Sequence, residues 1–267
     1  MSKPVVFRIC QFLMLLQLLS YTDTVRSIAL GAFDTIGLVG PMVRMEAVAN
    51  GYSALGWATA LALSFTSLAP LASRLIYALA GMMWFDVLTT WPLDMPLPDG
   101  FLYWGSAVVL IQLAIGFALE RQFGYLLPAP LIGYRRYGFL LFAAIFAYSA
   151  LSLGNGEFLK SEIPEIVHFP HLIANGIEAT GWTAVFFLAA SKSACWAARL
   201  GLFLLGMWIW DMFTTLPLMM PVPAGQGMWG PVSILVLFFA LRPLLSSKLY
   251  QNQVKNDSVS KLRSDSP

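Results

Sequence analysis

An internal duplication constrains the fold of this chain more than any other feature of its sequence. Residues 49–105 align with residues 174–230 without a gap, and 25 of the 57 aligned positions are identical. The shared residues include Gly81 and Gly206, Asp86 and Asp211, Thr89-Thr90 and Thr214-Thr215, and Trp104 and Trp229. An ungapped match of this length indicates that the two halves adopt one fold. A position in the first half therefore has a counterpart 125 residues further along the chain.

The composition places the chain among integral membrane proteins. Apolar residues make up 58% of its 267 residues and charged residues 11%, whereas a soluble domain carries about 25% charged residues. The net charge of +2 and the scattered basic residues predict no nucleic-acid partner. Cys10 and Cys195 are far apart, and the sequence has no Cys-x-x-Cys motif and no Cys/His cluster, which excludes thiol-disulfide exchange from the candidate activities.

Eight apolar stretches approach the length of about 20 residues that a helix needs to cross a bilayer. They cover residues 4–21, 49–68, 71–92, 101–121, 134–154, 172–190, 196–217 and 228–245. Four stretches in each half mean that both halves enter the membrane in the same direction, as parallel repeats. We therefore predict an all-α integral membrane protein with eight transmembrane helices. Residues 1–125 and 126–245 each form a four-helix unit, and residues 246–267 form a disordered cytoplasmic tail.

The distribution of basic residues predicts the orientation. If the amino terminus is cytoplasmic, 13 of the 16 Lys and Arg residues fall in inner segments, in agreement with the positive-inside rule. We therefore expect a multi-pass protein of a bacterial-type inner membrane, with both termini in the cytoplasm and the lipid bilayer as its immediate partner. Arg74 and Arg199 mark the inner ends of corresponding helices, and their side chains are expected to extend toward the cytoplasmic interface.

Two kinds of segment lie between the predicted helices. Residues 22–48 and 155–171 are expected to lie on the outer surface, against the mouth of the bundle. Proline-rich residues 92–98 and 217–223 end a helix in each half, and because proline stops a helix and stiffens the chain after it, they are expected to form rigid outer turns.

Asp86 and Asp211 are the carboxylates that fall deepest inside the apolar stretches. Asp86 lies 12 residues beyond Arg74, which is about 18 Å at 1.5 Å per residue and places it in the outer leaflet. An acidic side chain inside a spanning helix costs about 2.5–3.5 kcal/mol of insertion free energy, so polar neighbours are expected. The residues predicted to gather in an outward-facing polar pocket are Asp86, Thr89, Thr90 and Asn50 of the first half, and Asp211, Thr214, Thr215, Asn175 and Glu178 of the second.

Two interpretations of this pocket remain open from the residues alone. The carboxyl groups can accept hydrogen bonds that hold helices together, or they can bind a polar ligand or relay a proton. Glu178 adds a further alternative, because its counterpart is Ser53. Its carboxylate is expected either to be exposed at a helix end or to point into a pocket shared with Asp211.

Glu165, His168 and His171 follow one another at intervals of three residues. On a helix such residues can face the same way, and a carboxylate with neutral imidazoles suits a divalent transition metal. Pro164 and Pro170 interrupt the stretch, however. We therefore interpret the histidines as solvated residues of an outer loop and predict no metal site. A metal bound by His168 and His171 is the alternative.

The second half resembles the DoxX-like membrane proteins. The resemblance rests on Ala174-Asn-Gly-Ile-Glu178-Ala-Thr-Gly181-Trp182, an apolar run, a short turn, and Arg199-Leu-Gly-Leu-Phe-Leu-Leu-Gly206. It covers residues 170–245 and, through the repeat, residues 45–121, where Ser53 replaces the acidic residue. It implies two fused four-helix units. Because that family includes subunits linked to quinone-dependent oxidation, the resemblance also implies a quinone as candidate cofactor and membrane redox subunits as candidate partners.

The sequence contains no nucleophile with a base, no phosphate loop and no complete metal-ligand set, so it assigns no reaction. The leading hypothesis is a redox-associated membrane subunit that binds a quinone or similar amphipathic molecule, with Asp86 and Asp211 accepting or relaying a proton. The alternative is a small-solute transporter in which the same aspartates couple transport to protons. A third hypothesis is a structural or assembly subunit in which the Asp–Thr clusters only hold helices together.

Overall fold

The structure is a computed structural model that describes residues 3–32, 40–91, 100–123, 130–131, 133–156, 165–215 and 226–245. This part of the chain holds eight α-helices, one 3-10 turn and no strand. The elements are α1 (Lys3–Ala29), α2 (Gly40–Ser64), α3 (Ala69–Thr90), α4 (Phe101–Phe123), η1 (Tyr134–Arg136), α5 (Tyr137–Gly154), α6 (Glu165–Ala189), α7 (Ala194–Thr215) and α8 (Gln226–Leu245). The two proline-rich segments and the predicted tail lie outside the described residues.

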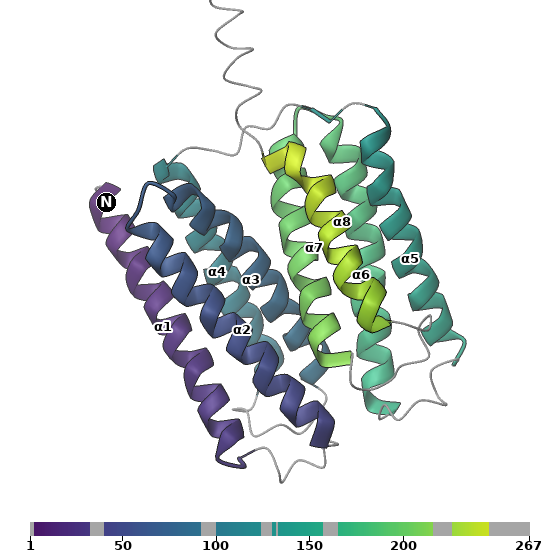
Figure 1. Ribbon diagram of the computed structural model, residues 1–267, viewed down its shortest axis with the longest axis horizontal. Coiled ribbons are helices and arrows are strands. Elements are labelled where there is room, and N and C mark those ends of the chain that lie inside the picture. The colour runs from purple at the N-terminus through teal and green to yellow at the C-terminus, as the bar shows by residue number, and fades with distance from the viewer. Residues whose placement is uncertain are drawn as a thin grey trace, which may run out of the picture.

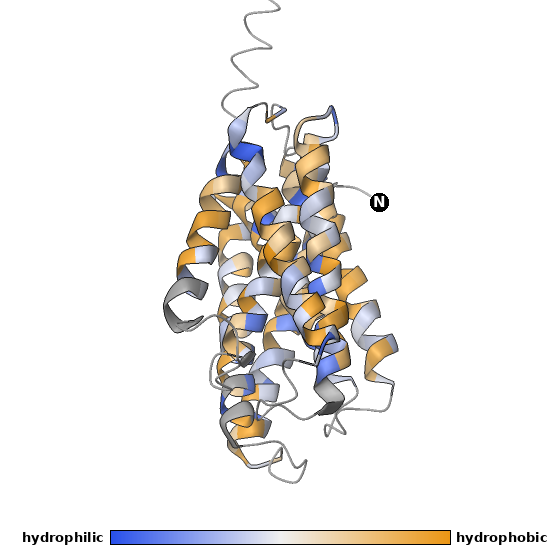
Figure 2. Cartoon of the chain, turned by 90° about the vertical axis from the view of Figure 1, so that its right-hand side faces the viewer, coloured by the Kyte–Doolittle hydropathy of each residue, from blue (hydrophilic) through white to orange (hydrophobic). Residues whose placement is uncertain are grey.

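Hydrophobic residues make up much of the helices (Figure 2). Five helices are long and apolar enough to cross a membrane, and several such helices in one chain indicate a multi-pass membrane protein. They cover Pro4–Ala29, Ala69–Thr90, Phe101–Phe123, Tyr134–Gly154 and His168–Ala189. Gly230–Leu245 of α8 is apolar but shorter. The other two helices, α2 and α7, each carry an arginine and an acidic residue among their apolar side chains.

The eight helices form two groups of four that lie side by side, α1–α4 and α5–α8, with α3 and α7 between them (Figure 1). The bounds of α2 and α6 differ by 125 residues at both ends, and so do those of α3 and α7. The start of α1 and the end of α8 lie at the same end of the bundle (Figure 1), which we call the terminal end. Both α3 and α7 run from this end to the opposite one, the far end.

The two groups meet where α3 crosses α7 at a pair of glycines. A Cβ atom on Gly81 would collide with the carbonyl oxygen of Phe203, and a Cβ atom on Gly206 would collide with the carbonyl oxygen of Ala78. Small residues at such a crossing let two helix backbones touch, which strengthens van der Waals packing between helices in a membrane. Because Phe203 is the counterpart of Ala78, the contact is reciprocal, as it is around a two-fold axis.

A second helix contact pairs a glycine with a large aliphatic residue in both groups, but the glycine lies on a different helix in each. In the first group Gly116 of α4 packs against Ile76 of α3, whereas in the second group Leu241 of α8 packs against Gly201 of α7. Leu241 is the counterpart of Gly116, and Gly201 is the counterpart of Ile76. The large and the small residue have therefore changed helices, which preserves close packing although neither position is identical.

The helices at the far end extend further than the sequence predicted. α1 continues to Ala29 and ends at Gly31, whose φ of 80° allows the Ala32 N–H to donate to the Ser27 carbonyl oxygen at 3.1 Å, an arrangement that closes a helix. α2 begins at Gly40 and α6 at Glu165. The segments expected between the helices, residues 22–48 and 155–171, are therefore in part helical and extend α1, α2 and α6.

Candidate functional site

A polar cavity of about 100 Å³ lies among the four helices of the first group. Two carboxylates line it, Glu46 of α2 and Asp86 of α3, together with the amide of Asn50 and the phenol of Tyr21. We call these four residues the first polar cluster. The remaining lining residues are Gln17, Ser20, Thr24, Met83, Phe101, Trp104 and Val108.

The course of the helices explains why two acidic residues meet here. Glu46 lies near the start of α2 and Asp86 near the end of α3, and these helix ends both lie at the far end of the bundle (Figure 1). Glu46 is 8% exposed and Asn50 is 6% exposed. The carboxylates are close enough to interact electrostatically, so a negative charge on one disfavours a negative charge on the other.

Most hydroxyl and amide donors beside Asp86 bond to the helix backbone. Asn50 Nδ2 donates to the Glu46 carbonyl oxygen at 2.8 Å. Thr90 Oγ1 donates to the Asp86 carbonyl oxygen at 2.6 Å, and Thr89 Oγ1 donates to that of Phe85 at 2.9 Å. Both threonines are buried, and neither lines the cavity. The structure therefore places Asp86 and Asn50 at the cavity wall, with Thr90 behind it and close enough to hydrogen bond to the Asp86 carboxylate.

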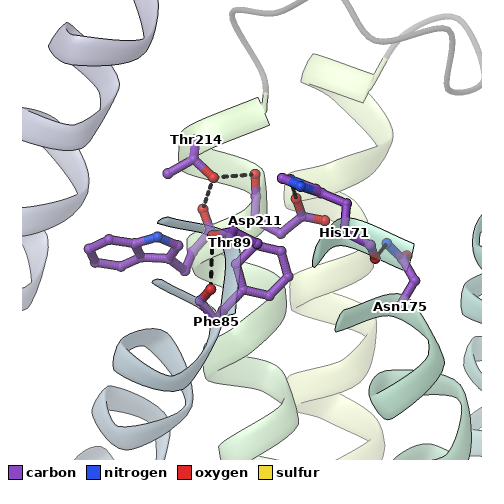
Figure 3. Close-up of polar contacts among 7 residues, drawn as sticks. Phe85, Thr89, His171, Asn175, Asp211 and Thr214 are labelled. Atoms are coloured by element: carbon purple, nitrogen blue, oxygen red, sulfur yellow. Dashed lines mark hydrogen bonds and ion pairs between the residues drawn. The ribbon is translucent and has the colours of Figure 1, made fainter. Parts of the chain in front are cut away.

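The second group contains a second polar cluster, which we define as His171, Asn175, Glu178 and Asp211. His171 Nε2 lies 4.0 Å from Asp211 Oδ1, and the two side chains are 8% and 10% exposed (Figure 3). Asn175 Nδ2 donates to the His171 carbonyl oxygen at 2.8 Å, just as Asn50 does in the first group. An imidazole and a carboxylate from α6 and α7 thus face each other in a buried setting.

The threonines of α7 follow the pattern of those in α3. Thr214 Oγ1 donates to the carbonyl oxygens of Trp210 and Asp211 at 3.1 and 3.3 Å (Figure 3). Thr215 is the last residue of α7, and its side chain lies outside the described part of the chain. The Thr214 hydroxyl therefore donates its hydrogen bond to carbonyl oxygens of its own helix.

Glu178 follows Asn175 on α6 by about one helix turn, and its side chain is 1% exposed. Trp182 Nε1 donates to its Oε2 atom at 3.3 Å, and the Asp211 carboxylate is close enough to act on it electrostatically. The Oε1 atom of Glu178 has no hydrogen-bond partner among the described residues. Of the two placements that the sequence left open, the structure shows the buried one, beside Asp211.

His171 is a buried helical residue, and the expectation of a solvated loop histidine is wrong for it. α6 begins at Glu165 and continues through Pro170, which lies inside the helix in its second turn. The His171 ring meets the ring of Phe85 from α3 edge-on, with centroids 5.8 Å apart, so the second cluster touches the first group. Across the described ranges, no group of three His, Cys, Asp or Glu side chains is placed to hold a metal.

The two clusters differ chemically despite their shared origin. The counterpart of Glu46 is His171, and the counterpart of Glu178 is the buried Ser53. The first cluster therefore pairs two carboxylates, whereas the second combines two carboxylates with an imidazole. These are the side chains that enzymes and transporters use to exchange protons.

A third buried polar group lies toward the terminal end, and the sequence did not indicate it. Arg199 Nε donates to Glu120 Oε2 at 2.9 Å, and the Tyr77 hydroxyl donates to the same oxygen at 2.8 Å. The guanidinium carbon lies 4.8 Å from the ring centroid of Phe117 and 4.6 Å from that of Trp196. With Arg199 7% exposed and Glu120 1% exposed, the expectation that Arg199 extends toward the cytoplasm is wrong.

Comparison of this chain with family models, with curated proteins and with solved structures finds no match.

Proposed function

We propose that the chain is an eight-span membrane protein built from two parallel four-helix units, residues 1–125 and 126–245, in a bacterial-type inner membrane. Three observations support this proposal: the apolar helices, the shared helix bounds of the two groups, and the reciprocal contact at Gly81 and Gly206. The positive-inside rule assigns the terminal end to the cytoplasm. The two polar clusters then face the outer half of the bilayer.

Within this architecture we propose that the polar clusters bind a small polar solute and couple its movement to protons, with Asp86 and Asp211 as the coupling residues. The observation that carries the proposal is the presence of Glu46 and Asp86 in one cavity of about 100 Å³. Two neighbouring carboxylates favour sharing a proton, because like charges at short range oppose each other. A solute or cation that enters displaces that proton. Parallel repeats occur among secondary transporters.

The second candidate function is the binding of a quinone or similar amphipathic molecule within a membrane redox assembly. The observation that favours it is the aromatic and apolar part of the cavity wall, where the rings of Phe101 and Trp104 meet with centroids 4.7 Å apart. The DoxX-like resemblance points the same way. The volume opposes it, since ligand pockets hold about 300–1,000 Å³, and the cavity must enlarge to admit a quinone ring.

Uptake measurements in proteoliposomes separate these candidates. The wild-type protein, with the pH-sensitive dye pyranine inside the vesicles and a mixture of small amino acids, organic acids and sugars outside, is expected to raise the interior pH, because each solute that enters displaces a proton outward. Asp86→Asn and Asp211→Asn are expected to slow this by about tenfold or more, because an amide cannot carry the exchanged proton. Asp23→Asn is the matched control, since Asp23 is 73% exposed near the end of α1.

Equal rates of interior pH change for the wild type and both asparagine variants would contradict proton coupling. Mass spectrometry of solvent extracts from the same purified samples tests the second candidate. A stoichiometric quinone that is present in the wild type and lost in Asp86→Asn would support it. Lower unfolding temperatures in both variants, with neither uptake nor a bound quinone in the wild type, would show that the aspartates only hold helices together.

A further inference from the structure

A cleft of about 400 Å³ lies between α3, α7 and α8 toward the terminal end of the bundle, away from both polar clusters. Two arginines line it, Arg74 of α3 and Arg242 of α8. All its other lining residues are aliphatic or aromatic, and they are Leu71, Leu75, Ala78, Leu202, Leu205, Phe238 and Leu245. The cleft therefore combines two positive charges with an otherwise apolar wall.

Arg74 lacks the carboxylate partner that its counterpart has. Arg199, the counterpart of Arg74, bonds to Glu120 at 2.9 Å. The counterpart of Glu120 is Leu245, which lines the cleft. The Nε atom of Arg74 is buried without a hydrogen-bond partner among the described residues. No ion pair within the described part of the chain includes Arg74 or Arg242.

The surroundings of the two corresponding arginines have diverged consistently. On the Arg199 side, Tyr77 donates a hydrogen bond to Glu120, and Phe117 covers the guanidinium. Their counterparts in the cleft are Leu202 and Arg242. One side has therefore gained an acid that neutralises its arginine, whereas the other has a second arginine. Glu120 is near enough to act electrostatically on Arg74, but its hydrogen bonds go to Arg199 and Tyr77.

We propose that this cleft binds one anionic glycerophospholipid of the leaflet at the terminal end. A phosphate oxyanion matches the two guanidinium groups, which can donate paired hydrogen bonds to it. The acyl chains lie along the apolar wall, where Leu71 is 39% and Phe238 is 47% exposed. Basic pockets between helices on the cytoplasmic side bind anionic headgroups. The proposal rests on the membrane architecture given above and is independent of any transport activity.

Native mass spectrometry of the detergent-purified full-length chain tests the proposal. After delipidation, the protein is mixed with phosphatidylglycerol or with phosphatidylcholine of the same acyl chains. The wild type is expected to retain one phosphatidylglycerol per chain, with at least tenfold preference over phosphatidylcholine. Arg242→Gln, at an exposed position, and the double variant Arg74→Gln/Arg242→Gln are expected to lose this preference.

Two further variants make the test specific to the cleft. Arg121→Gln removes an exposed basic residue at the same end of the bundle and is expected to bind lipid as the wild type does. Leu245→Glu places in the cleft the acid that the first group has at Glu120, and it is expected to abolish binding by pairing with Arg74.

Equal retention of both lipids by the wild type would overturn the proposal. So would a loss of preference in Arg121→Gln as large as that in Arg242→Gln. Competition by millimolar inorganic phosphate would show that the cleft takes a free anion, and it would overturn the assignment to lipid. Because each result is read from bound mass, a failure of the transport experiments leaves this outcome unchanged.

Discussion

Alanine at Gly81 or Gly206 is expected to destabilise the protein by about 3 kcal/mol or more. The added methyl group would collide with the backbone carbonyl oxygen of the facing helix, Phe203 in one case and Ala78 in the other. A clash with a side chain can be relieved by a rotamer change, but a clash with a helix backbone requires the helices to separate. Overpacking costs about 1–3 kcal/mol where side chains can adjust and occasionally more, and this site belongs at the upper end.

The chain supplies a matched pair of controls for this prediction. Gly51 and Gly176 are also counterparts within helices, and a Cβ atom on either would meet nothing within 4 Å. Alanine there is expected to stabilise by about 0.5–1 kcal/mol through its helix propensity. The unfolding temperatures of all four variants are compared by heating the proteins in detergent and measuring the folded fraction by size-exclusion chromatography. A Gly81→Ala protein as stable as Gly51→Ala would contradict the proposed contact between α3 and α7.

Arg199→Leu is expected to cost about 3–5 kcal/mol of stability. It would remove the guanidinium that pairs with the Glu120 carboxylate, which is 1% exposed, while the Tyr77 hydroxyl, a neutral donor, stays in place. An unpaired buried charge is strongly destabilising, whereas an apolar pair of similar volume in the same place is close to neutral.

The double variant Arg199→Leu/Glu120→Leu is therefore expected to recover most of that loss, to within about 1–2 kcal/mol of the wild type. Arg26→Leu is the control: it breaks an ion pair of 3.9 Å whose side chains are 75% and 73% exposed, and exposed pairs contribute less than about 1 kcal/mol. Chemical unfolding in mixed micelles measures all three. Equal losses in the single and double variants would show that Glu120 and Arg199 act separately.

The repeat made much of the fold predictable from the sequence. Apolar length predicted a helical membrane protein, and the described part of the chain is all-helical with five helices long and apolar enough to span a bilayer. Helix ends were harder to predict. Residues 22–29 are largely polar, and yet α1 runs to Ala29, with the Thr22 and Thr24 hydroxyls donating to carbonyl oxygens of the preceding turn at 2.8 and 3.1 Å.

One part of the candidate site was predictable, because helix direction and spacing brought Asp86 and Asn50 to the same level, and both line one cavity. The side toward which each polar group turns was not predictable, since it depends on which helices pack together. His171 was assigned to a loop because Pro170 precedes it, but the proline lies inside α6. Glu120 and Arg199 are 79 residues apart, and no local spacing rule connects them.

The reciprocal contact at Gly81 and Gly206 has a consequence for how such a chain diversifies. Two separate identical chains could meet through this same patch, and in such a homodimer every substitution would appear on both sides of the axis at once. Joining the two copies in one polypeptide removes that coupling, because each side then mutates alone. A symmetric dimer could not encode the differences between the counterparts Glu120 and Leu245, or between Glu46 and His171.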